Sequence, residues 1–200
     1  MPYQNRVLAT GDIVQDPARG LFMGNRGILH DANQRLGRAR WRHKAWVTCA
    51  LNHKDWHRQI MQPGHNTELF FLDEAVALAA GHRPCALCRR SDYRAFLKAL
   101  AHTGTAKDLD HALHRSRVIP RTTHHRRHRA DIKSLPPGTI IWRDAPFLVT
   151  ETALHQVQPD AYSVPTDRPL SGQTDVLTPA LTVQALRAGY RPVLHPSTRL

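Results

Sequence analysis

The chain contains little of what marks a secreted or membrane-bound protein. It has only three cysteines in 200 residues, an odd and small number that argues against a secreted scaffold held by disulfides. No segment approaches the run of about 18 apolar residues that a membrane span requires. The start, MPYQNRVLATGDIV, also lacks the basic and apolar regions of a secretory signal. We therefore expect a soluble, cytoplasmic protein without a membrane partner.

Acidic residues are scarce as well. Asp and Glu number 16 against 28 Lys and Arg, and 14 histidines add further positive charge in mildly acidic solution. This balance favours a polyanionic partner, because each cation placed near a phosphate releases condensed counterions. The alternative is that the charge only keeps the protein soluble. At 41% hydrophobic residues, the chain can bury a core as one domain or as two small ones.

Hydrophobic patterning in the first half predicts strands followed by helices. The segments with strand-like patterning are residues 6–14, 38–51 and 67–71. The second of these alternates basic and apolar side chains, which predicts one cationic face. Asp73 is expected to cap a helix that Gly81 ends, because Asp accepts hydrogen bonds from the first turn and Gly adopts a positive φ. Two more helices are expected at residues 91–102 and 105–116.

The composition changes after the third predicted helix. Residues 114–138 are crowded with His and Arg, contain few large apolar residues and end in Pro-Pro-Gly, which predicts an exposed basic linker. Four extended segments follow, at residues 139–143, 146–150, 161–164 and 174–178. Thr178 and Pro179 are then expected to begin a helix that ends at Gly189.

Two of the three cysteines form a Cys-x-x-Cys knuckle, Cys85 and Cys88. The tight turn between them brings both sulfurs to one point, as in many structural zinc sites, and zinc requires two further ligands. Cys49 is the remaining thiol and His53 follows it by four residues, which predicts a Cys3His zinc site. His57, His65 and His82 are further candidates for the fourth ligand. The alternatives are reduced cysteines that only fill space and a redox pair, although the strand-then-helix setting of a redox motif is missing.

The segment NTELFFLDEAVALAAGHRPCALCRR, residues 66–90, resembles the second half of the zinc-binding amino-terminal domain of bacterial Ada alkylation-repair proteins. The resemblance places Cys49 and His53 where that family has its first two cysteines, and Cys85 and Cys88 at its knuckle. It implies DNA binding, and it gives Cys49 the position of the thiol that accepts a methyl group from a phosphotriester. Because His replaces one thiolate, the site carries less negative charge, and we expect its metal to be structural rather than reactive.

A glycine-rich loop at residues 23–31, MGNRGILHD, is a second candidate for chemistry. Its backbone N–H groups and Arg26 suit a phosphate, while His30 beside Asp31 suits proton transfer. The alternative is an ordinary turn with solvated polar residues. As an enzyme, the chain would then be a nuclease or base-processing enzyme acting through this loop, or an alkyl acceptor acting through Cys49.

Basic residues around these motifs predict a nucleic-acid surface. Bases would stack on Trp41, Trp46 and Trp56, which lie among Arg, His and Lys. The predicted phosphate-binding residues are Arg26, Arg40, Arg42, Lys44, Arg83, Arg89, Arg90, Arg126 and Arg127.

Together these features predict an α+β chain. A small zinc-stabilised domain (residues 1–115) precedes a basic His/Arg-rich linker (116–134) and a small mixed α/β domain (135–200). The predicted function is nucleic-acid binding, with DNA as the expected partner, through a basic surface beside a structural Cys3His zinc site. The alternative is the DNA-processing enzyme described above.

Overall fold

The computed structural model describes residues 1–54 and 59–199, which form two six-stranded sheets and four α-helices. The strands of the first sheet are β1 (Gln4–Val7), β2 (Ile13–Gln15), β3 (Phe22–Asn25), β4 (Val47–Ala50), β5 (Leu69–Phe71) and β6 (Arg83–Pro84). Those of the second are β7 (His128–Asp131), β8 (Ile140–Trp142), β9 (Pro146–Val149), β10 (Ala153–Gln156), β11 (Thr166–Asp167) and β12 (Gln173–Val176). The helices are α1 (Glu74–Ala79), α2 (Arg90–Ala99), α3 (Ala106–Arg117) and α4 (Ala180–Arg187), with 3-10 turns at Ile132–Ser134 and Pro196–Arg199.

The two sheets differ in their connections. The first has the order β2-β1-β5-β3-β4-β6 and contains two parallel pairs, β1 with β5 and β4 with β6. The second has the order β11-β10-β9-β8-β12-β7, and all its pairs are antiparallel. The mixture of helix and strand agrees with the predicted α+β class.

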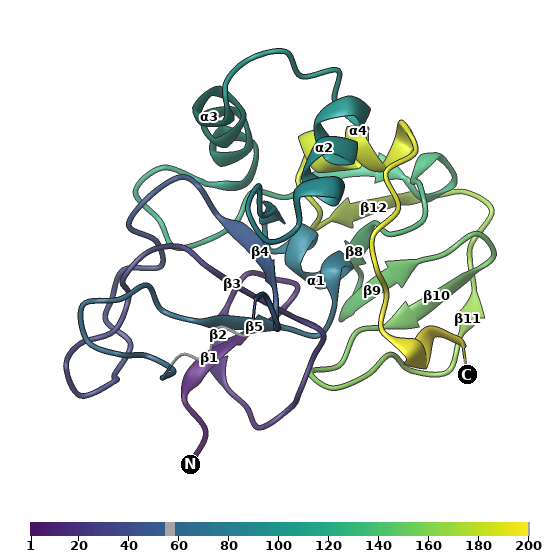
Figure 1. Cartoon of the computed structure of the whole chain (residues 1–200). Coiled ribbons are helices and arrows are strands. Elements are labelled where there is room, and N and C mark those ends of the chain that lie inside the picture. Colours follow the sequence, from purple (N-terminus) through teal and green to yellow (C-terminus); the bar gives the residue numbers. More distant parts are fainter. Residues whose placement is uncertain (55–58, 200) are drawn as a thin grey trace.

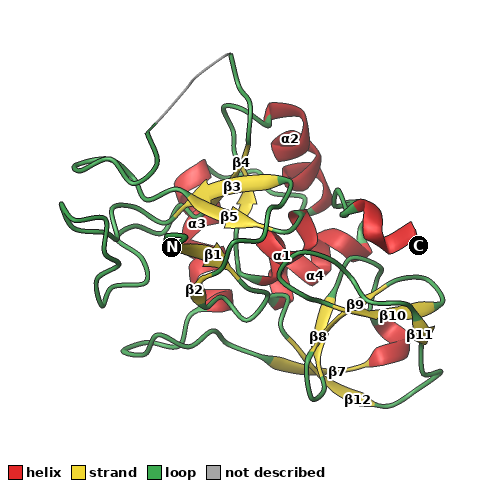
Figure 2. Ribbon diagram, turned by 90° about the horizontal axis from the view of Figure 1, so that it is seen from below, coloured by secondary structure: helices red, strands yellow, loops and turns green. Residues whose placement is uncertain are grey.

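Helix α1 lies between the two sheets (Figure 1). Its six residues are all buried, because each of its faces packs on a different group of side chains. Ala77 packs towards the first sheet with Phe71, Val76 towards the second with Ile140, and Leu78 towards the helices with Phe96. The separate groups of strands on either side are also visible from below (Figure 2).

The start of α1 is held by carboxylates that are themselves buried. Asp73 caps the helix by accepting from the Val76 N–H at 2.9 Å, and it also accepts from the Tyr162 hydroxyl and the His195 N–H. Burial raises the pKa of Asp73 to about 6. These bonds tie α1 to residues far along the chain, so buried contacts join both sides of the predicted linker. The division into two domains therefore remains a prediction.

The predicted helices are confirmed, with small changes at their starts. Asp73 caps α1 and Gly81 follows it with φ 82°. Thr105 begins α3 with a reciprocal capping box to Asp108. At α4 the Thr178 side chain accepts from the Ile140 N–H instead of capping the helix, so Pro179 is the first flanking residue.

Three strand predictions were wrong in whole or in part, and residues 161–164 form only an isolated bridge from Tyr162 to Val157. Residues 6–14 are not one strand, because Gly11 adopts φ 90° and turns the chain from β1 into β2. In the segment 38–51 only Val47–Ala50 pairs with a neighbour as a strand. The basic stretch before it runs as bends, since alternation of side chains does not by itself provide a partner strand.

Residues 116–134 are largely exposed, as their composition predicts, but they also contribute core contacts and a strand. Arg117 is fully buried, the His125 ring lies 5.5 Å from the Trp46 ring, and His128–Asp131 form strand β7. Composition predicts exposure here because cations are rarely buried. Most cations of the segment are exposed, and Arg117 is the buried exception because backbone carbonyls and an aromatic face, contributed by distant segments, interact with its charge.

Candidate metal centre and adjoining cavity

The three cysteines meet because two strands pair in parallel. Cys49 lies on β4, and the β4–β6 pairing places Thr48 opposite Pro84. The Cys85 N–H then continues the ladder by donating to the Thr48 carbonyl at 2.9 Å. The chain turns through the knuckle to Cys88 and enters α2. Cys85 and Cys88 are therefore presented beside a strand residue from 36 positions earlier in the chain (85 − 49 = 36).

The sulfur atoms of Cys49, Cys85 and Cys88 all lie within 4.8 Å of one another. Three ligands of a tetrahedral zinc ion with bonds of about 2.3 Å would lie about 3.8 Å apart. All three cysteines are free thiols with half-buried side chains. A small inward adjustment of the sulfurs would therefore accommodate an ion, so these three residues can hold a metal.

The thiols also influence one another's ionisation. Hydrogen bonds with the thiols of Cys49 and Cys88 lower the pKa of Cys85 far below its usual value, and the Leu87 N–H contributes by donating to its sulfur at 3.4 Å. The hydrogen bond to Cys85 raises the pKa of Cys49. The cluster therefore favours a thiolate stabilised by its neighbouring thiols, and the thiolate is the form that binds metal.

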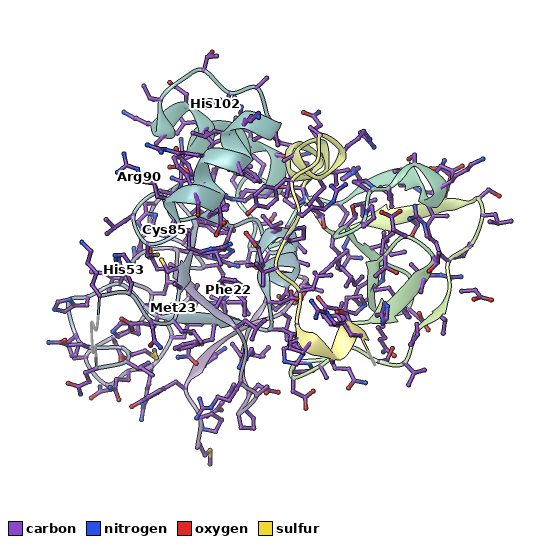
Figure 3. The ribbon with its side chains drawn as sticks, turned by 45° about the vertical axis from the view of Figure 1, so that its right-hand side comes forward. Phe22, Met23, His53, Cys85, Arg90 and His102 are labelled. Carbon is purple, nitrogen blue, oxygen red and sulfur yellow. The ribbon has the colours of Figure 1, made fainter. Side chains whose placement is uncertain are left out.

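The candidates for a fourth ligand lie in different places. His53 lines the same cavity as the three cysteines, although its ring nitrogens are not among the atoms that lie within 4.8 Å of the sulfurs. Figure 3 shows His53, Cys85 and Met23 on one side of the first sheet, with Arg90 nearer the helices. His57 lies outside the described residues, and His65 is exposed.

His82 does not reach the cysteines. Its ring is fully buried between Trp46 and Phe71, and its Nε2 atom faces the Arg26 Nε at 3.3 Å. The structure thus leaves His53 as the described histidine that shares a cavity with the sulfurs.

A cavity of about 400 Å³ opens beside the three sulfurs. Its apolar lining comes from Met23, Val47, Leu51, Ile60, Phe70 and Leu87. Its polar lining comes from Asn25, Asn52, His53, Asn66, Thr67 and Glu68. The volume lies in the usual range for small-molecule sites, about 300–1,000 Å³. The cysteine cluster therefore faces a space that a ligand could enter.

Strand register explains which side chains form the floor of this cavity. Met23 on β3 lies directly opposite Cys49 on β4 and Phe70 on β5, so the three side chains share one face of the sheet. Two residues further along, Val47 opposes Asn25 on the same face. Glu68 precedes β5 and alternates with Leu69, which places it on the face of Phe70.

Glu68 is the acidic residue among the described lining, and the sequence prediction missed it. Its side chain is only 6% exposed, and Oε2 accepts from the Met61 N–H at 2.8 Å. The alternation in TELFF indicated that Glu68 and Phe70 share a face. Which other strands this face adjoins depends on sheet order, which the sequence does not reveal.

His30 and Asp31 are not brought together as a proton-transfer pair. The His30 ring is buried, with Nδ1 2.6 Å from the Thr67 hydroxyl and Nε2 3.2 Å from the Gln62 carbonyl. Asp31 is exposed and accepts from the backbone N–H groups of Asn33 and Arg35, which lower its pKa. His30 instead supports Thr67 in the cavity wall, and Asp31 stabilises a turn.

Three of the predicted phosphate-binding arginines are buried and engaged within the protein. Arg83 is 4% exposed and forms a two-pronged ion pair with Asp110 at 2.7 and 2.9 Å. Arg89 is 5% exposed and pairs with Glu74 and Asp92. Neither guanidinium is available to a phosphate, so these predictions were wrong.

Arg26, the third buried arginine that was predicted to bind phosphate, belongs to a buried cluster around Trp46. Trp46 is fully buried, and the Cζ atoms of Arg26 and Arg117 lie 4.2 and 3.9 Å from its ring centroid. Burial lowers the pKa of Arg26 to about 9. Trp46 is therefore part of the core and not a stacking surface for bases.

The other predicted stacking residues also differ from expectation. Trp41 is half-buried and packs 5.6 Å from the Trp46 ring, while Trp56 lies outside the described residues. The remaining predicted phosphate-binding residues are at least partly exposed: Arg40, Arg42, Lys44, Arg90, Arg126 and Arg127.

A second tryptophan, Trp142 at the end of β8, gathers exposed arginines. The Arg127 Cζ lies 4.6 Å from its ring centroid. Trp142 lines one hollow of about 510 Å³ with Arg129 and Arg143, and another of about 350 Å³ with Arg126 and Arg127. We call Trp142 and these four arginines the Trp142 surface. Sequence reasoning missed Trp142, Arg129 and Arg143 because the order of the second sheet brings them together.

No family model, curated protein or solved structure matches this chain. The resemblance to the Ada zinc-binding domain therefore remains a prediction. Among the described residues, no helix has the length and apolar character needed to cross a bilayer.

Proposed function

We propose that this chain is a zinc-binding protein that binds nucleic acid, with DNA as the expected partner. The observation that carries the proposal is the cluster of Cys49, Cys85 and Cys88, whose sulfurs lie within 4.8 Å of one another. Zinc suits this cluster because thiolates bind it strongly and in tetrahedral geometry. The ion would join β4 to the knuckle and to the start of α2, and His53 is the candidate for its fourth ligand.

Nucleic-acid binding is supported by the exposed cations. The formal net charge is +12, and four exposed arginines line the two hollows that share Trp142. Arginine binds phosphates, while an aromatic ring stacks on bases, so the two together suit a single strand. Asp12 and Asp175 also line these hollows, but the arginines outnumber them.

Metal analysis tests the first half of the proposal. Protein purified without added chelator should contain one zinc per chain, and Cys49→Ser or Cys88→Ser should reduce that content severalfold. Ser preserves the size of the side chain but is a much weaker ligand. His102→Gln, at a half-buried position outside the cavity, is the matched control and should retain zinc. A wild-type protein that takes up no zinc on titration would contradict this half.

Fluorescence anisotropy with labelled single-stranded and double-stranded DNA and with RNA tests the second half. Binding should weaken with salt, and Arg127→Gln and Arg143→Gln should each reduce the slope of log K against log salt by about 0.7–0.9, because each removes one phosphate contact. Arg35→Gln, at an exposed position outside the Trp142 surface, should leave the slope unchanged. Absence of binding at low salt to all three nucleic acids would contradict the proposal.

Alkyl transfer to Cys49 is the second candidate function, because this cysteine lines an open cavity instead of lying in a closed shell. Incubation with DNA that carries methyl phosphotriesters, followed by intact mass measurement, would show one added methyl group. The group should map to Cys49 by peptide analysis. An unchanged mass would leave the zinc site without this activity.

A further inference from the structure

We propose that the cavity beside Cys49, Cys85 and Cys88 is a hydrolytic site for an amino-bearing nucleobase, in which Glu68 moves the protons; this rests on the zinc binding proposed above. A catalytic zinc site differs from a structural one in keeping a coordination position open to substrate and water. Three protein thiolates and an adjoining space of about 400 Å³ provide that arrangement.

The cavity lining indicates the chemical class of the substrate. The chain has 28 Lys and Arg, yet none is among the described residues that line this cavity. Within the described lining, a phosphate or carboxylate would find no cationic side chain to pair with, which favours an uncharged group at this part of the cavity. The cavity also has much apolar surface, from Met23, Val47 and Phe70 on its floor, which suits a flat ring.

The polar groups in the cavity suit the edge of a base. Asn25, Asn52 and Asn66 each offer an amide donor and an amide acceptor. Amide side chains pair with the ring nitrogen and exocyclic amine of bases in two-point hydrogen bonds. A neutral heterocycle with an amino group therefore matches the shape, the charge and the hydrogen-bonding capacity of the lining.

Glu68 is the described carboxylate that lines the cavity with the three cysteines, and we assign it the proton transfer. It is a buried carboxylate on the same side of the sheet as Cys49, separated from it by strand β3. Its Oε2 is anchored by the Met61 N–H, which holds the side chain in place. Zinc enzymes that remove amino groups from bases combine three ligands, which include cysteines, with a glutamate that is not a ligand.

The proposed step balances without an oxidant or reductant. The ion supplies Lewis acidity that makes water a stronger acid. Glu68 accepts a proton from water, and the oxygen forms a bond to the ring carbon that carries the amine. Glu68 then delivers the proton to the nitrogen, the carbon–nitrogen bond breaks, and ammonia leaves. One water is consumed, and the proton of the new hydroxyl moves to the neighbouring ring nitrogen as the ring gains a carbonyl in place of its amine.

The test combines ammonia release with binding. Zinc-loaded protein would be incubated with cytosine, adenine and guanine as free bases, as nucleosides and within single-stranded oligonucleotides. We expect one of these to release ammonia, and the form that reacts identifies whether the base is free or part of a strand. Glu68→Gln should reduce the rate at least 100-fold, because a proton-transfer group contributes about 10²–10⁴-fold. The matched control Glu151→Gln, at an exposed position, should retain the full rate.

Binding provides a readout that does not require turnover. Calorimetry with Glu68→Gln should show that the reactive base still binds, since Gln keeps the size of the side chain, and Asn25→Leu should weaken that binding at least 10-fold. X-ray absorption should report three sulfurs and one oxygen at the zinc. Stoichiometric zinc with no base bound or deaminated, or with His53 as its fourth ligand, would overturn this inference but keep the zinc proposal. A protein that binds no zinc would overturn both.

Discussion

Two tryptophans in this molecule are each covered by arginine, yet their surroundings differ in almost every other respect. Trp46 is fully buried, and the guanidiniums of Arg26 and Arg117 both lie within 4.2 Å of its ring centroid. Trp142 is half-buried, and Arg127 lies 4.6 Å from its centroid beside open hollows. The same pair of residue types thus stabilises the core in one region and forms an exposed cationic surface in the other.

The difference lies in what accepts the guanidinium hydrogen bonds. Around Trp46, the acceptors for Arg117 are the carbonyls of Gly81 and Lys44, both at 2.5 Å. No carboxylate forms an ion pair with Arg26 or Arg117 in the part of the chain that the structure describes. Around Trp142 the arginines are exposed to water. A buried cation needs fixed partners because desolvation is costly, whereas a surface cation can exchange water for phosphate.

Removal of the buried ring should have the largest effect on stability. We expect Trp46→Ala to lower the free energy of unfolding by about 3–5 kcal/mol, because it leaves a cavity and removes the aromatic face from two cations. Urea denaturation measures this change. Trp142→Ala should cost less than half as much, and equal losses at the two positions would contradict the contrast between the two regions.

Loss of a buried ion pair should likewise lower stability more than loss of an exposed one. Asp110→Ala leaves the buried Arg83 without its partner, which should cost about 3–5 kcal/mol. Asp175→Ala removes the exposed partner that lies 4.0 Å from Arg129 and should cost about 0–1 kcal/mol. Thermal and urea melts of both variants test this comparison. A large loss for Asp175→Ala would show that the surface pair also contributes to the core.

Acidification should destabilise the protein through the histidines that pack near Trp46. Burial lowers the pKa of His82 and of His125, so below about pH 6.5 the unfolded chain binds protons that the folded chain does not. Stability should therefore fall as the pH decreases from 7 to 5, because protonation of these two histidines favours the unfolded chain. Asp73 acts in the opposite direction, because its raised pKa adds about 1 kcal/mol of stability over the same range.

Histidine variants separate the effect of histidine protonation on stability from the effect of losing a bound metal at low pH. His125→Gln should reduce the difference in unfolding free energy between pH 7 and pH 5, while the exposed His65→Gln should leave it unchanged. Denaturation at both pH values measures the difference. An unchanged pH dependence in His125→Gln would mean that this histidine is protonated in the folded state.

The last comparison concerns binding and not folding. Trp142→Ala should weaken affinity for single-stranded DNA by about 1–3 kcal/mol, which is about 5-fold to 150-fold, because one base loses its stacking partner. Anisotropy at fixed salt measures it, and Trp142→Phe should recover part of the affinity. If Ala and wild type bind equally, the Trp142 surface is not where the bases lie.

Local chemistry made several features predictable. The cap at Asp73, the turn at Gly81 and the capping box at Thr105 depend on residues close together in the sequence, so the helices they begin or end were predicted. The cysteines were identified as a cluster because the chain has only three and two form a knuckle. Hydrophobic alternation alone did not reveal that residues 6–14 form a hairpin.

The sequence by itself therefore determined the presence and approximate position of the four helices, the mixed helix and strand content and which three cysteines could form a cluster, since each follows from neighbouring residues or from elimination. Only the tertiary structure decided which cations are buried, because burial depends on acceptors such as Asp110 and the Gly81 carbonyl that lie far away in the chain. It also decided that Glu68 and Asn25 share a cavity with Cys49. That arrangement results from strand order, which is set by packing of whole sheets and not by any local pattern.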